Sequence, residues 1–200
     1  MDESKIIGVF GGTFDPIHDG HIAAARSVLN ALALEKVIFV PAGDPYLKTV
    51  NSPVTSAGDR YKMVTLALQN EGNPKFEASD IEVFREGPSF TMDTVMELAA
   101  SFEELVLILG MDAVLSLPNW RDPEGLFEKC RVVAVTRPGF ESSAMDLLPF
   151  QNIIDKIEVV VADTPDLSAT EIRAHFQQGL PVSGVCPAVA HFVIQKGLYL

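Results

Sequence analysis

Residues 8–21 have the sequence Gly8-Val-Phe-Gly-Gly-Thr-Phe-Asp-Pro-Ile-His-Asp-Gly-His21, and they indicate how the fold begins. The apolar run at 6–10 predicts a buried strand, which the two glycines then end. The Thr, Asp and Pro that follow favour a turn, and the Ala-rich spacing of residues 22–34 predicts a helix that starts near Asp19. A strand, a glycine-rich turn and a helix in this order present open backbone N–H groups and a helix N-terminus. The sequence therefore predicts a phosphate-binding site at one end of a sheet.

The rest of the chain alternates apolar strands with amphipathic helices. Further strands are predicted at 36–41, 105–109, 131–135 and 157–161, with short strand-like segments in 75–84. Further helices are predicted at 59–69, from a capping Thr91 to residue 100, after 110–112 up to Pro118, from a capping box at 168–171, and near the end of the chain. This alternation favours an α/β fold, a Rossmann-like, doubly wound parallel sheet with helices on both faces. We expect residues 1–200 to form a single domain with a small helical part from about 165.

Composition narrows the class of protein. With 48% apolar and 21% charged residues, the 200-residue chain can bury a full core, and its formal net charge is −12. Such a charge predicts no sequence-independent binding to nucleic acid or to an anionic membrane. The apolar runs are too short to span a bilayer, the acidic first residues do not resemble a signal peptide, and neither cysteine has a CxxC partner. We therefore expect a cytoplasmic protein with reduced thiols, as a monomer or a homo-oligomer.

Two common motifs are absent or incomplete. The chain contains no GxGxxG sequence, so the usual dinucleotide fingerprint is missing. His18 and His21 have the spacing of a metal-binding pair, but no carboxylate or third histidine is placed to complete a zinc-hydrolase motif. We therefore predict no metal held by the protein itself, and a metal hydrolase is a distant alternative.

Two stretches carry a resemblance to a known family. Residues 11–21 resemble the T/HxGH signature of the nucleotidyltransferase superfamily, and Ser168-Ala-Thr-Glu-Ile-Arg173 resembles its second signature, usually written SSTxIR or ISxTxxR. Within the superfamily the sequence is most similar to the bacterial nicotinate mononucleotide adenylyltransferases. The likeness extends through nearly the whole chain, at 87–91, 110–112, 120–122, 137–139 and 197–199.

The resemblance implies adenylyl transfer from ATP to nicotinate mononucleotide, which gives deamido-NAD and pyrophosphate. The 5′-phosphate of the acceptor would attack the α-phosphorus of ATP. Since this nucleophile is already an anion near neutral pH, the enzyme has to align two polyanions and neutralise charge on the phosphates. Mg²⁺ would arrive with ATP, held mainly by phosphate oxygens and water.

The resemblance also implies roles for individual residues. His18, His21, Lys48 and Arg173 are the expected catalytic groups, with His21 closest to the developing charge. Arg173 would clasp pyrophosphate, because a guanidinium offers a planar fork of donors for phosphate oxygens. The expected contacts to ATP come from both signatures and from the 110–112 block: Gly11, Gly12, Thr13, Phe14, His18, His21, Gly110, Asp112, Ser168, Thr170 and Arg173.

A separate group of residues is expected at the acceptor. By resemblance, Trp120 would stack on the pyridine ring and Thr91 would bind the ring carboxylate. The whole group comprises Lys48, Phe90, Thr91, Trp120 and Arg121. The sequence departs from the family pattern at Leu47, where His is common, at Phe90, where Tyr is common, and at Ala169, where Ser is common.

Three alternatives to this function stay open. The same chemistry could use nicotinamide mononucleotide, and acid differs from amide by one polar group at the ring. It could use 4′-phosphopantetheine, which the chain length and the 110–122 block disfavour. The third alternative is a nucleotide-binding regulator without turnover, which the intact His18, His21 and Arg173 disfavour.

Overall fold

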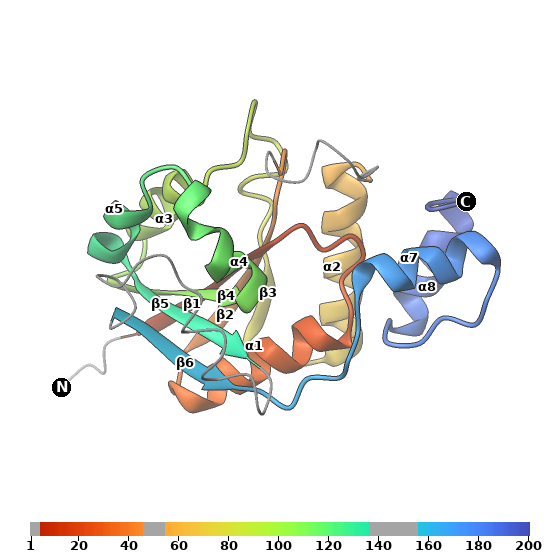
Figure 1. The fold of residues 1–200 in the computed structure, drawn as a ribbon, viewed down its shortest axis with the longest axis horizontal. Helices are drawn as coiled ribbons and strands as arrows, with labels where there is room; N and C mark the ends of the chain where they lie inside the picture. The colour runs from red at the N-terminus through yellow and green to blue at the C-terminus, as the bar shows by residue number, and fades with distance from the viewer. Residues whose placement is uncertain (1–4, 46–54, 137–155) are drawn as a thin grey trace. The chain divides into compact units, whose positions relative to one another are not determined.

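The fold is described from a computed structural model, which describes residues 5–45, 55–136 and 156–200 (Figure 1). In these ranges six strands form one sheet in the order β3-β2-β1-β4-β5-β6. Their bounds are β1 Ile6–Gly12, β2 Lys36–Pro41, β3 Phe76–Ala78, β4 Glu104–Gly110, β5 Arg131–Thr136 and β6 Ile157–Val161. The β1–β4, β4–β5 and β5–β6 pairs are parallel. The predicted α/β fold with a Rossmann-like parallel sheet is confirmed.

The sheet is doubly wound about its first strand. The chain adds β2 and β3 on one side of β1 and β4, β5 and β6 on the other, so the switch point lies between β1 and β4. Sheets of this kind bind ligands beyond the carboxyl ends of their strands, near the switch point. Residues 105–109 of β4 are each at most 2% exposed, as expected for a parallel strand covered on both faces. Gly8 in β1 lies in a tightly packed place, because a Cβ there would lie 2.9 Å from the Leu34 side chain.

The helices agree with most of the sequence predictions. Their bounds are α1 Asp19–Ala31, α2 Ala57–Glu71, α3 Thr91–Ala99, α4 Met111–Ser116, the 3₁₀ helix η1 Leu117–Asn119, α5 Pro123–Lys129, α7 Ala169–Gln178 and α8 Pro187–Lys196. None of the helices in the described residues is long and apolar enough to cross a membrane.

The structure differs from the sequence predictions in four places. Helix α5 was not predicted, and it forms because Asp122 caps it with a side-chain bond from the Gly125 N–H. Within 75–84 only Phe76–Ala78 is a strand. Thr91 begins α3 but does not cap it, since Phe90 holds the N-cap position without a side-chain bond. Ser168 is the N-cap of α7, but its side chain makes no capping bond, so the capping box is not formed.

The chain divides into two compact units. The first unit contains Met1–Gly11, Ala24–Ile38 and Phe90–Asp163, and the second contains Gly12–Ala23, Phe39–Ser89 and Thr164–Leu200. In the first unit α3 packs on α5, and α4 packs on β4 and β5. In the second unit α2 packs against α8. The single domain predicted from the sequence stays a prediction.

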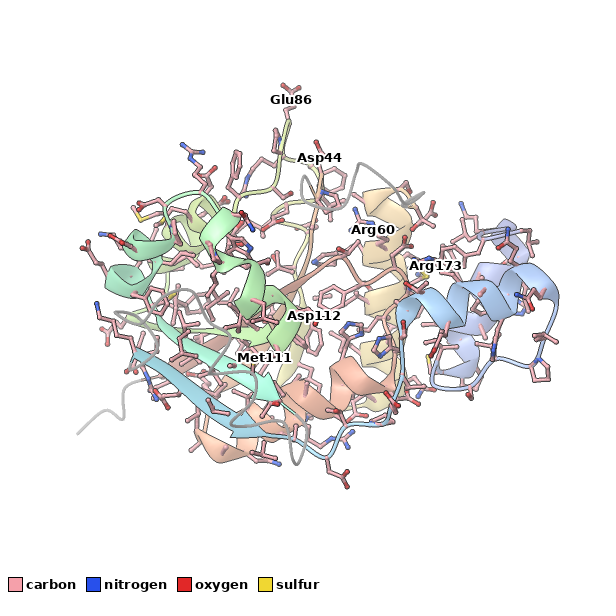
Figure 2. All side chains as sticks on the ribbon, viewed as in Figure 1. Asp44, Arg60, Glu86, Met111, Asp112 and Arg173 are labelled. Atoms are coloured by element: carbon pink, nitrogen blue, oxygen red, sulfur yellow. The ribbon has the colours of Figure 1, made fainter. Side chains whose placement is uncertain are left out.

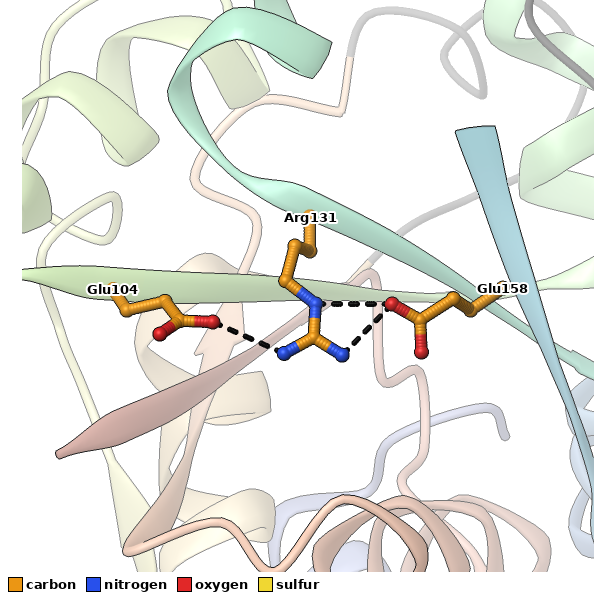
Figure 3. A network of polar contacts seen from close by, with 3 residues as sticks. All are labelled: Glu104, Arg131 and Glu158. Carbon is orange, nitrogen blue, oxygen red and sulfur yellow. Dashed lines mark hydrogen bonds and ion pairs between the residues drawn. The ribbon is translucent and has the colours of Figure 1, made fainter. Parts of the chain in front are cut away.

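A salt-bridge network ties the amino ends of three strands in the first unit (Figure 3). Arg131 donates from its Nη1 to Glu104 at 3.0 Å and from its Nη2 to Glu158 at 2.8 Å. These hydrogen bonds raise the pKa of Arg131. Because the three side chains are 35–45% exposed, solvent screens the network, and each pair contributes about 1 kcal/mol or less. The network fixes the strand ends opposite to those where the predicted ligand residues follow.

Candidate nucleotidyl-transfer site

The two histidines of the first signature lie together at the start of α1, in the second unit. We call residues 12–21 the signature segment. The backbone N–H of His18 donates to Nδ1 of His21 at 3.2 Å, and the two ring centroids are 3.8 Å apart. A ring nitrogen that accepts a hydrogen bond carries no proton, so we infer that the proton of the His21 ring is on Nε2. His21 therefore offers an N–H donor from a half-buried position at the mouth of a helix.

Two neighbouring residues of the segment face inward. Phe14 is 2% exposed and its ring meets the His21 ring edge to face, with centroids 5.0 Å apart and planes at 77°. Asp15 is 4% exposed, and Oδ1 of its carboxylate accepts from the Thr55 hydroxyl at 2.7 Å and the Tyr199 hydroxyl at 2.6 Å. Phe14 therefore supports the His21 ring from within, and its predicted contact with ATP stays a prediction.

Arg60 is a buried cation that sequence reasoning missed. It lies on α2, is 1% exposed, and donates to three backbone carbonyls (Figure 2). The acceptors are Thr55 O at 3.1 Å, Thr13 O at 2.9 Å and Gly43 O at 2.9 Å. Burial lowers the pKa of Arg60, while the nearby charge of Asp15 raises it. Arg60 thus joins the signature segment to the turns that follow β2 and precede α2.

The sequence contained a signal for this arginine. Arg60 shares a helix face with the fully buried Met63 and Val64, which follow it by three and four residues. A charged residue in the apolar stripe of a helix is the informative exception, because charges are seldom fully buried without partners.

The second signature meets the first through its arginine. Arg173 on α7 donates from Nη1 to the Asp15 carbonyl at 2.8 Å and from Nη2 to the Thr170 hydroxyl at 3.3 Å (Figure 2). Residues 158 positions apart in sequence are therefore in direct contact. The guanidinium is half-buried and has more N–H donors than these two bonds use. Thr170 is exposed, and Ser168 is half-buried at the start of the same helix.

The predicted acceptor residues lie in the first unit. The guanidinium of Arg121 lies 4.9 Å from the Phe90 ring centroid and makes an ion pair with Asp93 at 3.3 Å. Trp120 is half-buried, and its Nε1 donates to the Ser116 hydroxyl at 2.9 Å. Thr91 follows Phe90 directly, as the first residue of α3. The structure thus brings Phe90, Thr91 and Arg121 together, with Trp120 next to Arg121 in the chain.

The remaining predicted residues are placed as follows. Gly110 caps α4 and Asp112 is in its first turn, both exposed at the carboxyl end of β4 (Figure 2). Gly11 and Gly12 are the last residues of β1. Lys48 lies outside the described residues, as do Leu47 and the block at 137–139. In the ranges that the structure covers, no group of three or more His, Cys, Asp or Glu residues is placed to hold a metal ion.

Comparison with known proteins identifies the family. Residues 9–175 match the family model described as cytidylyltransferase-like. The chain belongs to this family. It is 38% identical over 197 residues to the probable nicotinate-nucleotide adenylyltransferase of Corynebacterium kroppenstedtii, covering 97% of this chain and 90% of that protein. It is 40% identical over 197 residues to the protein of the same name from Rubrobacter xylanophilus, covering 96% and 91%.

Solved structures share the fold of this cytidylyltransferase-like chain. The nicotinic acid mononucleotide adenylyltransferase of Plasmodium falciparum complexed with APC superposes with a TM-score of 0.74 at 19% identity, covering 98% of this chain and 97% of that one. The same protein complexed with NaAD gives 0.73 at 20% identity, over the same shares of the two chains. The family predicted from the two signatures is confirmed, and the chain is a nucleotidyltransferase.

Proposed function

We propose that this nucleotidyltransferase transfers the adenylyl group of ATP to nicotinate mononucleotide, giving deamido-NAD and pyrophosphate. The observation that carries the proposal is the contact between the two signatures, in which Arg173 bonds the carbonyl of Asp15 within the signature segment. Two relatives that bear the name probable nicotinate-nucleotide adenylyltransferase support the choice of acceptor. The alignment with this chain covers 90% and 91% of their lengths.

In the proposed reaction, an oxygen of the acceptor's 5′-phosphate forms a bond to the α-phosphorus of ATP. The bond from that phosphorus to the bridging oxygen breaks, and its electron pair leaves with pyrophosphate. Mg²⁺ enters as part of the MgATP substrate. The protein supplies donors for the charge that develops: Nε2–H of His21 for the oxygens of the reacting phosphorus, and the fork of Arg173 for pyrophosphate. Each donor is already oriented by a hydrogen bond elsewhere on its side chain.

The acceptor would be chosen by the group around Phe90. Aromatic rings at Phe90 and Trp120 suit the planar pyridine ring, and the cation of Arg121 beside Phe90 favours a ring that carries a carboxylate over one that carries an amide. Asp93 forms an ion pair with Arg121, so the preference for the acid depends on how strongly the ring carboxylate competes with Asp93 for this cation. The two free cysteines support a reducing, cytoplasmic setting, and the net charge of −12 supports small-molecule substrates rather than nucleic acid.

The test measures pyrophosphate release with ATP and Mg²⁺ and one acceptor at a time. The acceptors are nicotinate mononucleotide, nicotinamide mononucleotide and 4′-phosphopantetheine, with a reaction lacking any acceptor as the blank. We expect the fastest release with nicotinate mononucleotide, together with deamido-NAD identified by mass. Faster release with the amide would reassign the acceptor, and no release with any of the three would leave the nucleotide-binding regulator as the better description.

A further inference from the structure

We propose that Tyr199, next to the last residue of the chain, is a positioning residue for adenylyl transfer. It acts through Asp15, whose buried carboxylate accepts the Tyr199 hydroxyl and whose backbone carbonyl accepts Arg173. The inference rests on the proposed function, because it concerns the same reaction. Neither signature includes Tyr199, which lies 184 positions from Asp15 in the sequence.

The Asp15 carboxylate is enclosed by a small set of donors. Its Oδ1 accepts the Tyr199 hydroxyl at 2.6 Å and the Thr55 hydroxyl at 2.7 Å, and its Oδ2 accepts the Thr55 N–H at 3.3 Å. Asp15 is only 4% exposed. A buried carboxylate is tolerated when donors satisfy its lone pairs. Because Tyr199 supplies one of the two short bonds, its hydroxyl is needed to satisfy the buried carboxylate of Asp15.

The end of the chain is built to deliver that hydroxyl. Helix α8 ends at Gly197, whose φ of 65° and whose N–H bond to the Ile194 carbonyl reverse the chain. The Leu198 N–H bonds the Val193 carbonyl, which completes the reversal. Tyr199 itself has a φ of 67°, a backbone region that residues other than glycine seldom occupy. Such a backbone persists where surrounding contacts determine it, and here its ring also lies 6.0 Å from the Phe176 ring.

The other side of Asp15 leads to the proposed chemistry. Its carbonyl accepts Nη1 of Arg173 at 2.8 Å, so the peptide group of Asp15 orients the guanidinium proposed to bind pyrophosphate. Asp15 also lies three residues before His18 in the signature segment. Removing the Tyr199 hydroxyl leaves the carboxylate short of a donor and lets it turn toward another partner. The peptide turns with it, and transfer is sensitive to small displacements of an aligned group.

If Tyr199 served only the stability of the fold, removing its hydroxyl would lower the unfolding temperature and leave the turnover of the folded fraction unchanged. A positioning role changes kcat and the affinity for ATP at temperatures where the variant is fully folded. The two are therefore separated by assays well below the unfolding temperature, with melting curves recorded in parallel.

The experiment compares Tyr199→Phe with Tyr61→Phe, the same chemical change on helix α2. We expect Tyr199→Phe to lower kcat for pyrophosphate release about tenfold and to weaken binding of a non-hydrolysable ATP analogue several-fold by calorimetry, with the acceptor KM within twofold. Tyr61→Phe should match the wild type in all three. Thr55→Val, which removes the other short bond to Asp15, should repeat the effect and replaces Tyr199→Phe if that variant does not fold.

A double-mutant cycle tests the route through Arg173. If Tyr199 acts on Arg173, then Tyr199→Phe should reduce kcat by less than about threefold when Arg173 is already Lys. Equal reductions in the two backgrounds would overturn the route, and values of kcat and ATP affinity within twofold of the wild type would overturn the proposal even if the melting temperature falls. If the wild type releases no pyrophosphate with any acceptor, the proposed function fails instead. The affinity for the ATP analogue then decides: weakening supports the positioning role, and no change overturns it.

Discussion

Replacing Arg60 with Met tests whether one buried cation holds the loops around the signature segment. The methionine side chain fills part of the volume but offers no donor. Three carbonyls, those of Thr13, Gly43 and Thr55, then lose a partner at 2.9–3.1 Å. The negative charge of Asp15, one of the charges that raise the pKa of Arg60, loses its compensation as well.

The expected cost follows from these contacts. An acceptor left without a donor costs about 1–3 kcal/mol when it is buried. The three carbonyls here belong to half-buried residues, and their losses together would still exceed the effect of most substitutions. The loss is partly offset, because folding of the variant no longer has to remove a charged guanidinium from water. We therefore expect the free energy of unfolding to fall by about 3–5 kcal/mol, a large part of the roughly 5–15 kcal/mol of an ordinary domain. Arg60→Lys keeps the charge but reaches fewer of the carbonyls, so it should lose about half as much.

Urea unfolding followed by circular dichroism measures the change as a shift in midpoint at constant slope. Lys62→Met is the matched control, because Lys62 is exposed two residues further along α2. The control should stay within about 0.5 kcal/mol of the wild type. A loss below about 1 kcal/mol in Arg60→Met would mean that the three carbonyls find other donors, and it would refute the idea that Arg60 holds these loops together.

Three further predictions concern a buried thiol and two residues that are proposed to bind the substrates. Burial raises the pKa of Cys130 to about 11, so at alkaline pH the unfolded thiol ionises before the folded one does. The free energy of unfolding should fall by about 2–3 kcal/mol between about pH 9 and 11, be unaffected by this group below pH 9, and lose this part of its slope in Cys130→Ala. His21→Ala should lower kcat for pyrophosphate release by about a hundredfold or more, since one aligned donor to developing charge is commonly worth that much, and near-normal turnover would remove His21 from the chemistry. Trp120→Ala should raise the KM for nicotinate mononucleotide and leave that for ATP unchanged, and an unaltered acceptor KM would count against stacking.

The features that could be predicted from the sequence are those that depend on residues close together in the chain. The alternation of apolar strands and helices gave the α/β fold, and two contiguous signatures gave the family. Helix α5 was missed because it is short and begins after Asp122, whose left-handed backbone conformation is not indicated by the local sequence. The contacts of Arg60 and Tyr199 were missed for a different reason. The position of Arg60 in the apolar stripe of α2 was a signal for its burial, but not for its partners. The partners of both side chains are loop carbonyls and a carboxylate that only the tertiary fold brings near.

The geometry divides the first signature into two kinds of residue. His18 and His21 are half-buried at the mouth of α1, whereas Phe14 and Asp15 are almost fully buried and bind the protein itself. Phe14 packs against the ring of His21, and Asp15 holds Thr55, Tyr199 and the guanidinium of Arg173. A signature of this kind therefore encodes both the donors proposed for the phosphates and the internal contacts that fix those donors in advance. Preorganised donors stabilise developing charge without reorganising during the reaction. In an acidic protein that is proposed to bind two polyanions, holding a few cationic and N–H groups rigidly is the physical alternative to gathering more positive charge.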